Sequence, residues 1–161
     1  MACSLARSLD VAGEWWTPLI MRDIWLGHRR FDQIQANFGV SRKVLADRLE
    51  TLVDAGAVER RQYQTGPPRY EYHLTDKGKE LIEAFLVLIS WGDRWRSGAE
   101  GVPMLIRHRE CGHTAEAEVC CSHCGERLTA DNTRLEPGPG AREGWGTRDV
   151  FLLRPRAKRS A

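Results

Sequence analysis

Four cysteines and three histidines are gathered between residues 108 and 124. Two ligand pairs there share one pattern, with two residues between the ligands and a glycine after them: His108-Arg109-Glu110-Cys111-Gly112 and Cys121-Ser122-His123-Cys124-Gly125. The two-residue gap lets both side chains of a pair reach one ion, and the glycine permits the turn that aims backbone amides at the thiolates. Three thiolates and one imidazole fill a tetrahedral zinc site. The spacing therefore predicts a structural Zn²⁺ held by His108, Cys111, Cys121 and Cys124.

Neighbouring side chains leave the ligand set open. His113, Cys120 and His123 also lie in this stretch, and Cys111 with His113 could replace the first pair. We prefer His108 because it repeats the spacing of the second pair; a metal-free thiol cluster in a loosely packed tail is the alternative. A filled tetrahedron has no place for a reactive water, and no catalytic constellation stands out, so we expect no enzyme.

Residues 31–56 show a second pattern, that of two amphipathic helices joined by a short turn. Leu45, Leu49 and Leu52 recur at the spacing of a helix with one buried face, and Ser41 stands at its N-cap position. A shorter amphipathic pattern precedes Gly39, which suits the tight turn of a helix-turn-helix. The second helix of that motif enters the DNA major groove by its first residues. Helix pairs of this kind also occur in proteins that never touch DNA. The side chains expected at the groove are Ser41, Arg42, Lys43, Ala46, Asp47 and Glu50.

Two strand-like runs follow, VERRQYQ and RYEYHLT, separated by turn residues 64–68. A hairpin directly after a helix-turn-helix is typical of a winged helix. Arginines on an exposed hairpin are often merely solvated, but here they would suit phosphate contact or a narrow minor groove. The arginines expected to contact DNA are Arg60, Arg61 and Arg69.

Helical patterns flank this region. We expect a short helix in residues 1–13 and a second one that starts with Thr17 as its cap and Pro18 in its first turn, with tryptophans in the core. A long helix capped by Thr75 has an apolar face too wide for one wing to cover. A second copy of the chain is the expected cover, and folding back on its own domain is the alternative. The apolar residues are Leu81, Ile82, Phe85, Leu86, Leu88, Ile89 and Trp95.

Composition describes a globular protein: the 161 residues are 42% hydrophobic and 29% charged. No apolar run reaches the length of a membrane span and no signal peptide is visible, so we expect a cytoplasmic protein with no membrane partner. In that reducing compartment the five cysteines favour a metal over disulfides. The net charge of +2 is small, so DNA affinity must come from local patches.

From Cys3 to about Trp95 the chain resembles the HxlR-type winged-helix transcriptional regulators, which are related in architecture to MarR-type regulators. Several blocks in the right order carry this resemblance: Cys3–Asp10, Gly13–Thr17, Leu26–Phe31, Ser41–Leu45, Arg48-Leu49, Pro67–Tyr72 and Leu74–Gly78. Two positions depart from the family pattern, which often has Cys-Pro where Cys3-Ser4 stands and lysine where Glu14 stands.

The resemblance implies a homodimer that binds double-stranded DNA near promoters and controls a neighbouring gene; we expect a repressor, with activation as the alternative. It also makes Cys3 a candidate redox sensor, although a packed structural cysteine fits equally well. A small-molecule or redox effector remains open. The expected architecture is mostly α with a small β wing: a winged-helix and dimerisation domain (1–99), a zinc-ribbon-like β module (100–136) and a Gly/Pro-rich basic tail (137–161). A rival interpretation makes the zinc ribbon a protein-interaction module on a winged-helix scaffold.

Overall fold

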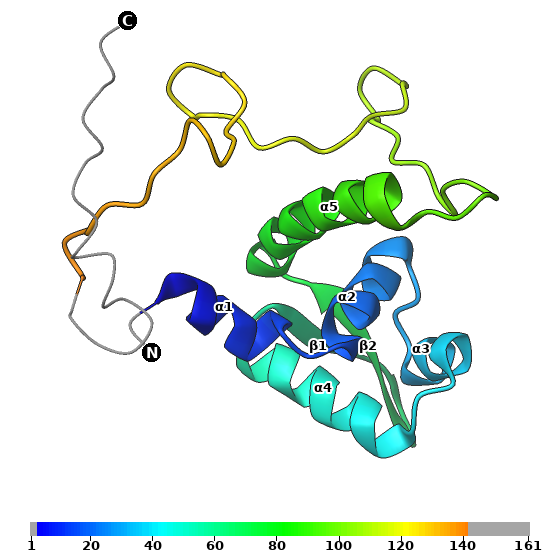
Figure 1. Ribbon diagram of the computed structural model, residues 1–161. Helices are drawn as coiled ribbons and strands as arrows, with labels where there is room; N and C mark the ends of the chain where they lie inside the picture. The colour runs from blue at the N-terminus through cyan, green and yellow to red at the C-terminus, as the bar shows by residue number, and fades with distance from the viewer. Residues whose placement is uncertain (1–2, 142–161) are drawn as a thin grey trace, which may run out of the picture.

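A computed structural model describes residues 3–141 and contains five helices and two strands within that range (Figure 1). In chain order they are α1 (Ser4–Ala12), α2 (Trp16–Leu26), α3 (Phe31–Phe38), α4 (Arg42–Asp54), β1 (Val58–Thr65), β2 (Pro68–Leu74) and α5 (Asp76–Arg96). The winged-helix part of the predicted fold class is confirmed, because a mostly helical body carries a two-stranded antiparallel wing. None of the helices in residues 3–141 is long and apolar enough to cross a membrane.

The core lies between α2, α3, α4 and the base of the wing, with Ile82 of α5 closing it. Two details of α2 differ from prediction. The helix begins at Trp16, and Thr17 lies buried inside its first turn instead of capping it. The tryptophans are also less buried than expected: Trp15 is 77% exposed and Trp25 is 45% exposed, while Trp16 packs at the edge of the core. Aliphatic side chains, not tryptophans, dominate the interior.

A buried carboxylate ties α2 to the helix-turn-helix. Asp23 is fully buried and accepts a hydrogen bond from the Asn37 side-chain amide of α3 at 2.7 Å. Its carboxylate also lies 3.3 Å from His28 Nδ1 and 3.1 Å from Arg22 Nη2. A buried charge is costly unless it is paired and hydrogen-bonded, and here three neighbours supply those partners. The contacts fix α3 against α2 and so set the position of the turn before α4.

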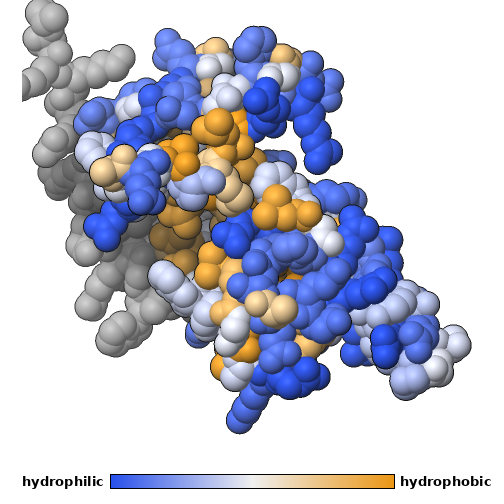
Figure 2. All heavy atoms as spheres, turned by 90° about the vertical axis from the view of Figure 1, so that its right-hand side faces the viewer, coloured by the Kyte–Doolittle hydropathy of each residue, from blue (hydrophilic) through white to orange (hydrophobic). Residues whose placement is uncertain are grey.

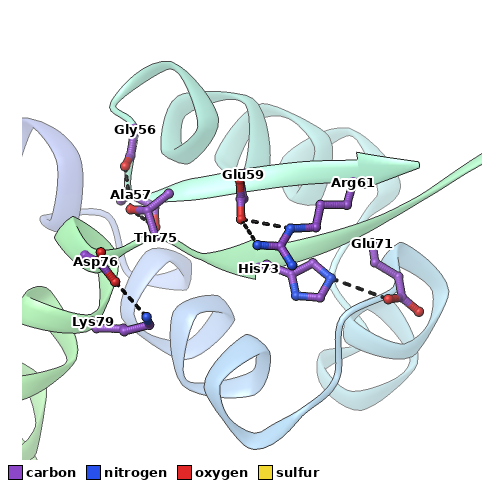
Figure 3. A network of polar contacts seen from close by, with 9 residues as sticks. All are labelled: Gly56, Ala57, Glu59, Arg61, Glu71, His73, Thr75, Asp76 and Lys79. Carbon is purple, nitrogen blue, oxygen red and sulfur yellow. Dashed lines mark hydrogen bonds and ion pairs between the residues drawn. The ribbon is translucent and has the colours of Figure 1, made fainter. Parts of the chain in front are cut away.

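The wing is joined to the body at its base. Val58 pairs with Leu74 and Arg60 with Tyr72 in the antiparallel register, which places Tyr72 and Leu74 on the face that packs on the core. The Thr75 hydroxyl donates to the Gly56 carbonyl at 2.7 Å (Figure 3). It also accepts from the Gly78 amide, so one residue links α4, β1 and the start of α5. The predicted cap of the long helix is confirmed.

Beyond α5 the described chain, residues 97–141, forms neither a helix nor a named strand. It contains two small hairpins, closed by the bridges Arg107↔Thr114 and Cys120↔Arg127, which Figure 1 shows well apart from one another. A single zinc-ribbon sheet is not what these residues form. The apolar run at residues 150–153 predicts either a short strand or a docking segment, but these residues lie outside the described part of the chain. The same holds for the basic tail from residue 142 onward.

Candidate nucleic-acid interface and metal-ligand hairpins

The start of α4 is presented to solvent. Gly39 adopts a left-handed conformation at the end of α3 (φ 62°), and the Ser41 hydroxyl accepts from the Val44 amide at 3.3 Å, as an N-cap should. Leu45 and Leu49 are buried against the body, which turns the opposite side of the helix outward. All six side chains predicted to face DNA are exposed: Ser41, Arg42, Lys43, Ala46, Asp47 and Glu50.

Three arginines near this surface lie over aromatic rings. The guanidinium carbons of Arg42, Arg60 and Arg30 lie 4.9 Å, 4.2 Å and 4.5 Å from the ring centroids of Phe31, Tyr70 and Tyr63 respectively. Such stacking limits the rotamers of the side chain, and Arg42 is held further because its Nη1 donates to Gln35 Oε1 at 3.2 Å. Less side-chain entropy is then lost when a phosphate binds.

The wing separates two arginines that were predicted together. Neighbouring residues of a strand point to opposite faces, so Arg60 and Arg61 cannot share one surface. Arg60 lines a cleft with Ala46 and Glu50 of α4. Arg61 is instead ion-paired with Glu59, as Figure 3 shows. Arg69 lies at the tip of the wing in a second cleft together with Arg30 and Arg42.

Arg30 is a member of this surface that the sequence interpretation missed. It precedes α3, and its Nε donates to Glu71 of β2 at 3.1 Å, joining the helix-turn-helix to the wing. The run His28-Arg29-Arg30 was a signal for it, but the pairing spans 41 residues and depends on the tertiary fold. Tyr72 lies beside it at the base of both clefts. Burial raises the pKa of the Tyr72 hydroxyl, partly offset by the charge of Arg60.

The two hairpins after α5 have the same backbone hydrogen bonds. In the first hairpin (residues 106–115) His108 N donates to His113 O, Gly112 N to His108 O, and Ala115 N to Ile106 O. In the second hairpin (residues 119–128) the bonds are Cys121 N to Glu126 O, Gly125 N to Cys121 O and Leu128 N to Val119 O, each displaced by 13 residues. Gly112 and Gly125 both have positive φ, at 71° and 77°.

Each hairpin brings its own ligand pair together. His108 Nδ1 lies 3.3 Å from Cys111 Sγ. In the second hairpin, backbone N–H groups of Cys124 and His123 donate toward Cys121, and these bonds, with the Cys124 side chain, lower the pKa of the Cys121 thiol. The pairs are not brought to each other, however. Among residues 3–141 no three His, Cys, Asp or Glu side chains are grouped closely enough to hold one metal ion.

The remaining predicted features lie on the helices. Cys3 is half-buried at the start of α1. On α5 the predicted apolar face divides in two: Ile82, Phe85 and Leu86 pack on the protein's own core, while the outer side is exposed. That outer side has Leu88 and Trp95 at 57% and 66% exposure, together with Trp91, which the prediction did not include, at 53%. The described protomer therefore covers only part of the helix.

The profile of the HxlR-like helix-turn-helix family matches residues 11–100. The chain belongs to this family. Its HxlR-like domain carries the exposed α4 and the wing, and the hairpins lie beyond it.

The similarity to some known proteins extends beyond the residues that the family profile matches. The chain is 44% identical to an uncharacterised HTH-type transcriptional regulator of Mycobacterium tuberculosis over 137 residues, which covers 85% of this chain and 87% of that protein. The crystal structure of PA1607, described as a transcription factor, superposes with a TM-score of 0.74 at 32% identity and covers 83% of this chain and 94% of that one. The reduced redox regulator HypR matches with a TM-score of 0.56 at 28% identity, over 59% of this chain and 95% of its own. Similarity to the first two thus extends into the hairpins, whereas HypR matches a shorter part of the chain.

Proposed function

We propose that this HxlR-like protein is a sequence-specific regulator of transcription that binds double-stranded DNA as a homodimer. The observation that carries the proposal is the common exposure of the α4 N-terminal turn and of the stacked arginines beside it. The first residues of α4 would read base edges in the major groove, and Arg30, Arg60 and Arg69 would contact phosphates. Repression by occupying a promoter is the mode we propose.

The geometry of the surface supports this assignment. Arg30, Arg42 and Arg69 line one cleft between the helix-turn-helix and the wing, so positive charge is concentrated where the helix would enter a groove. The net charge of the whole chain is only +2, which makes this local concentration the main source of attraction for phosphates. Phosphate contacts release counterions, so affinity should fall steeply as salt rises.

A double substitution tests the proposal. Binding selection from genomic DNA first supplies an operator, and Arg42→Ala with Lys43→Ala is then compared with the unchanged protein by fluorescence anisotropy. We expect specific affinity to fall by at least about thirtyfold, since two contacts worth roughly 1–3 kcal/mol each are lost. Unchanged operator affinity in the folded variant would remove α4 from the interface.

The chain offers a control with the same change in charge. Lys77→Ala with Lys79→Ala also removes two positive charges, but these residues lie in the first turn of α5, where Lys77 Nζ donates to the Ala55 carbonyl just after the end of α4. Since α4 has 13 residues, this is roughly 20 Å from its first turn. The control should bind the operator within about threefold of the unchanged protein.

A further inference from the structure

Each hairpin after α5 has the form of half a zinc site. The His108 and Cys111 ligand atoms are 3.3 Å apart, close to the roughly 3.5 Å that Zn–N and Zn–S bonds of about 2.0 and 2.3 Å require in a tetrahedron. When the two hairpins are aligned with an offset of 13 residues, Cys121 corresponds to His108 and Cys124 corresponds to Cys111. The same offset matches Cys120 with Arg107, as the two bridges show. It matches Glu126 with His113, as the backbone hydrogen bonds from Cys121 N and His108 N show. The repeat therefore identifies one ligand pair per hairpin and leaves Cys120 and His113 out.

The connection between the hairpins keeps these halves apart in one protomer. Only residues 116–118 separate them, and two contacts hold this segment along α5. Ala117 N donates to the buried Ser90 hydroxyl at 2.9 Å, and Glu116 is paired with Arg94 at 2.6 Å. Each hairpin offers two protein ligands, whereas a structural zinc ion takes four. One chain in this conformation cannot complete the site.

We propose that two copies of the chain complete each other's sites, so that His108 and Cys111 of one protomer and the partner subunit's Cys121 and Cys124 hold one structural Zn²⁺. The inference rests on the dimer of the proposed function. A two-fold axis across the 116–118 segments runs them in opposite directions, which places the first hairpin of each chain beside the second hairpin of the other. The dimer then holds two equivalent ions.

Exposed apolar side chains on the same part of the chain support a second copy as the occupant. Leu105 is 64% exposed, Val119 47% and Leu128 39%, all within or next to the hairpins. On the face shown in Figure 2, apolar side chains are also gathered in a hollow between two polar lobes. A groove between α2, α5 and residues 104–117 is lined by Leu86, Ile89 and Met104. Contact between the hairpins of two protomers would cover apolar surface that a single protomer exposes to water.

Complementation between two variants tests the exchange. One full-length chain carries His108→Ala with Cys111→Ser, and the other carries Cys121→Ser with Cys124→Ser, each with a different affinity tag. Zinc is counted by mass spectrometry after purification in zinc-containing buffer. Each variant alone has only half-sites and should hold no tightly bound zinc. The heterodimer isolated with both tags joins one intact first hairpin to one intact second hairpin and should hold one ion.

The other outcomes overturn the proposal. Zinc in the unchanged protein but none in the heterodimer would mean that each chain closes its own site, and an unchanged protein without zinc would remove the site altogether. Cys120→Ser and His113→Ala serve as matched controls that should keep two ions per dimer. Circular dichroism checks that the helices up to Arg96 persist. Loss of operator binding by the Arg42 and Lys43 variant leaves the zinc count unchanged, so failure of either proposal can be told from failure of the other.

Discussion

Arg60 and Arg61 are adjacent in the chain but have different surroundings. Arg60 lies over Tyr70 in a cleft beside α4, whereas Arg61 is paired with Glu59 on the opposite face of the wing. If α4 enters the groove, only Arg60 is close to the nearest phosphates. The difference makes a contrast between two equivalent substitutions informative.

We expect Arg60→Ala to weaken operator binding by about tenfold and to reduce the slope of log affinity against log salt by about one, as loss of one phosphate contact requires. Arg61→Ala should change affinity by less than about twofold. Anisotropy titrations between low and physiological salt measure both quantities. Equal losses in the two variants would show that the wing approaches DNA by the face opposite to the one proposed.

The role of a residue was predictable from the sequence where its hydrogen-bond partner lies only a few residues away in the chain. Ser41 and Thr75 cap their helices through amides three residues ahead, and both predictions hold. The prediction that Thr17 caps α2 was wrong, because the helix already begins at Trp16 and Thr17 lies inside its first turn. The role of Arg30 was missed because its partner Glu71 is brought near only by the packing of the wing. Side-chain pairing across the fold cannot be read from spacing along the chain.

The elements of the DNA-binding domain fit together through a backbone contact at Gly78. A Cβ atom at this position of α5 would lie 2.0 Å from the Ala57 carbonyl oxygen and 3.3 Å from Leu74 Cδ2. Glycine therefore lets the long helix approach the start of β1 closely enough for Thr75 to bond both Gly56 and Ala57. The docking of α5 on the wing depends on this close approach.

Gly78→Ala should lower the free energy of unfolding by at least about 2 kcal/mol, since the clash involves backbone and either α5 or β1 must move. Gly92→Ala is the matched control in the same helix, because apart from the adjacent residues and the local helix backbone no atom lies within 4 Å of a Cβ built there. It should raise stability by up to about 1 kcal/mol through the better helix propensity of alanine. Urea unfolding monitored by circular dichroism compares the two; a stable Gly78 variant would contradict the packing described.

For the helices and strands, the sequence predicted the winged helix well and the arrangement of residues 97–141 poorly. Periodic leucines and the turn at Gly39 were sufficient for the helix-turn-helix because each helix buries one regular stripe. The ligand spacing after α5 predicted two similar turns that need glycine, and Gly112 and Gly125 both have positive φ there. Whether those turns meet depends on residues 116–118 and on their contacts with Ser90 and Arg94, which no local pattern encodes.

For the whole molecule, the outer side of α5 indicates how two protomers would associate. Ala84, Leu88, Trp91 and Trp95 follow one another at intervals of four, three and four residues, so they form one stripe along the helix, and all four are exposed. The segment that follows the helix contacts Ser90 and Arg94 on a different side and leaves this stripe open. A two-fold pairing of the stripes would let each protomer present one α4, about 34 Å from the other, to successive major grooves.

Leu88→Glu with Trp91→Glu places two charges on that stripe, and we expect sedimentation equilibrium to show a monomer at micromolar concentration. Operator affinity should fall by at least about a hundredfold, because one half-site then has to bind without the other. Glu83→Gln, one residue away from the stripe on α5, should leave both the dimer and its affinity unchanged. A double variant that stays dimeric would move the interface away from α5. A monomer with undiminished operator affinity would show instead that a single winged-helix domain is sufficient for recognition.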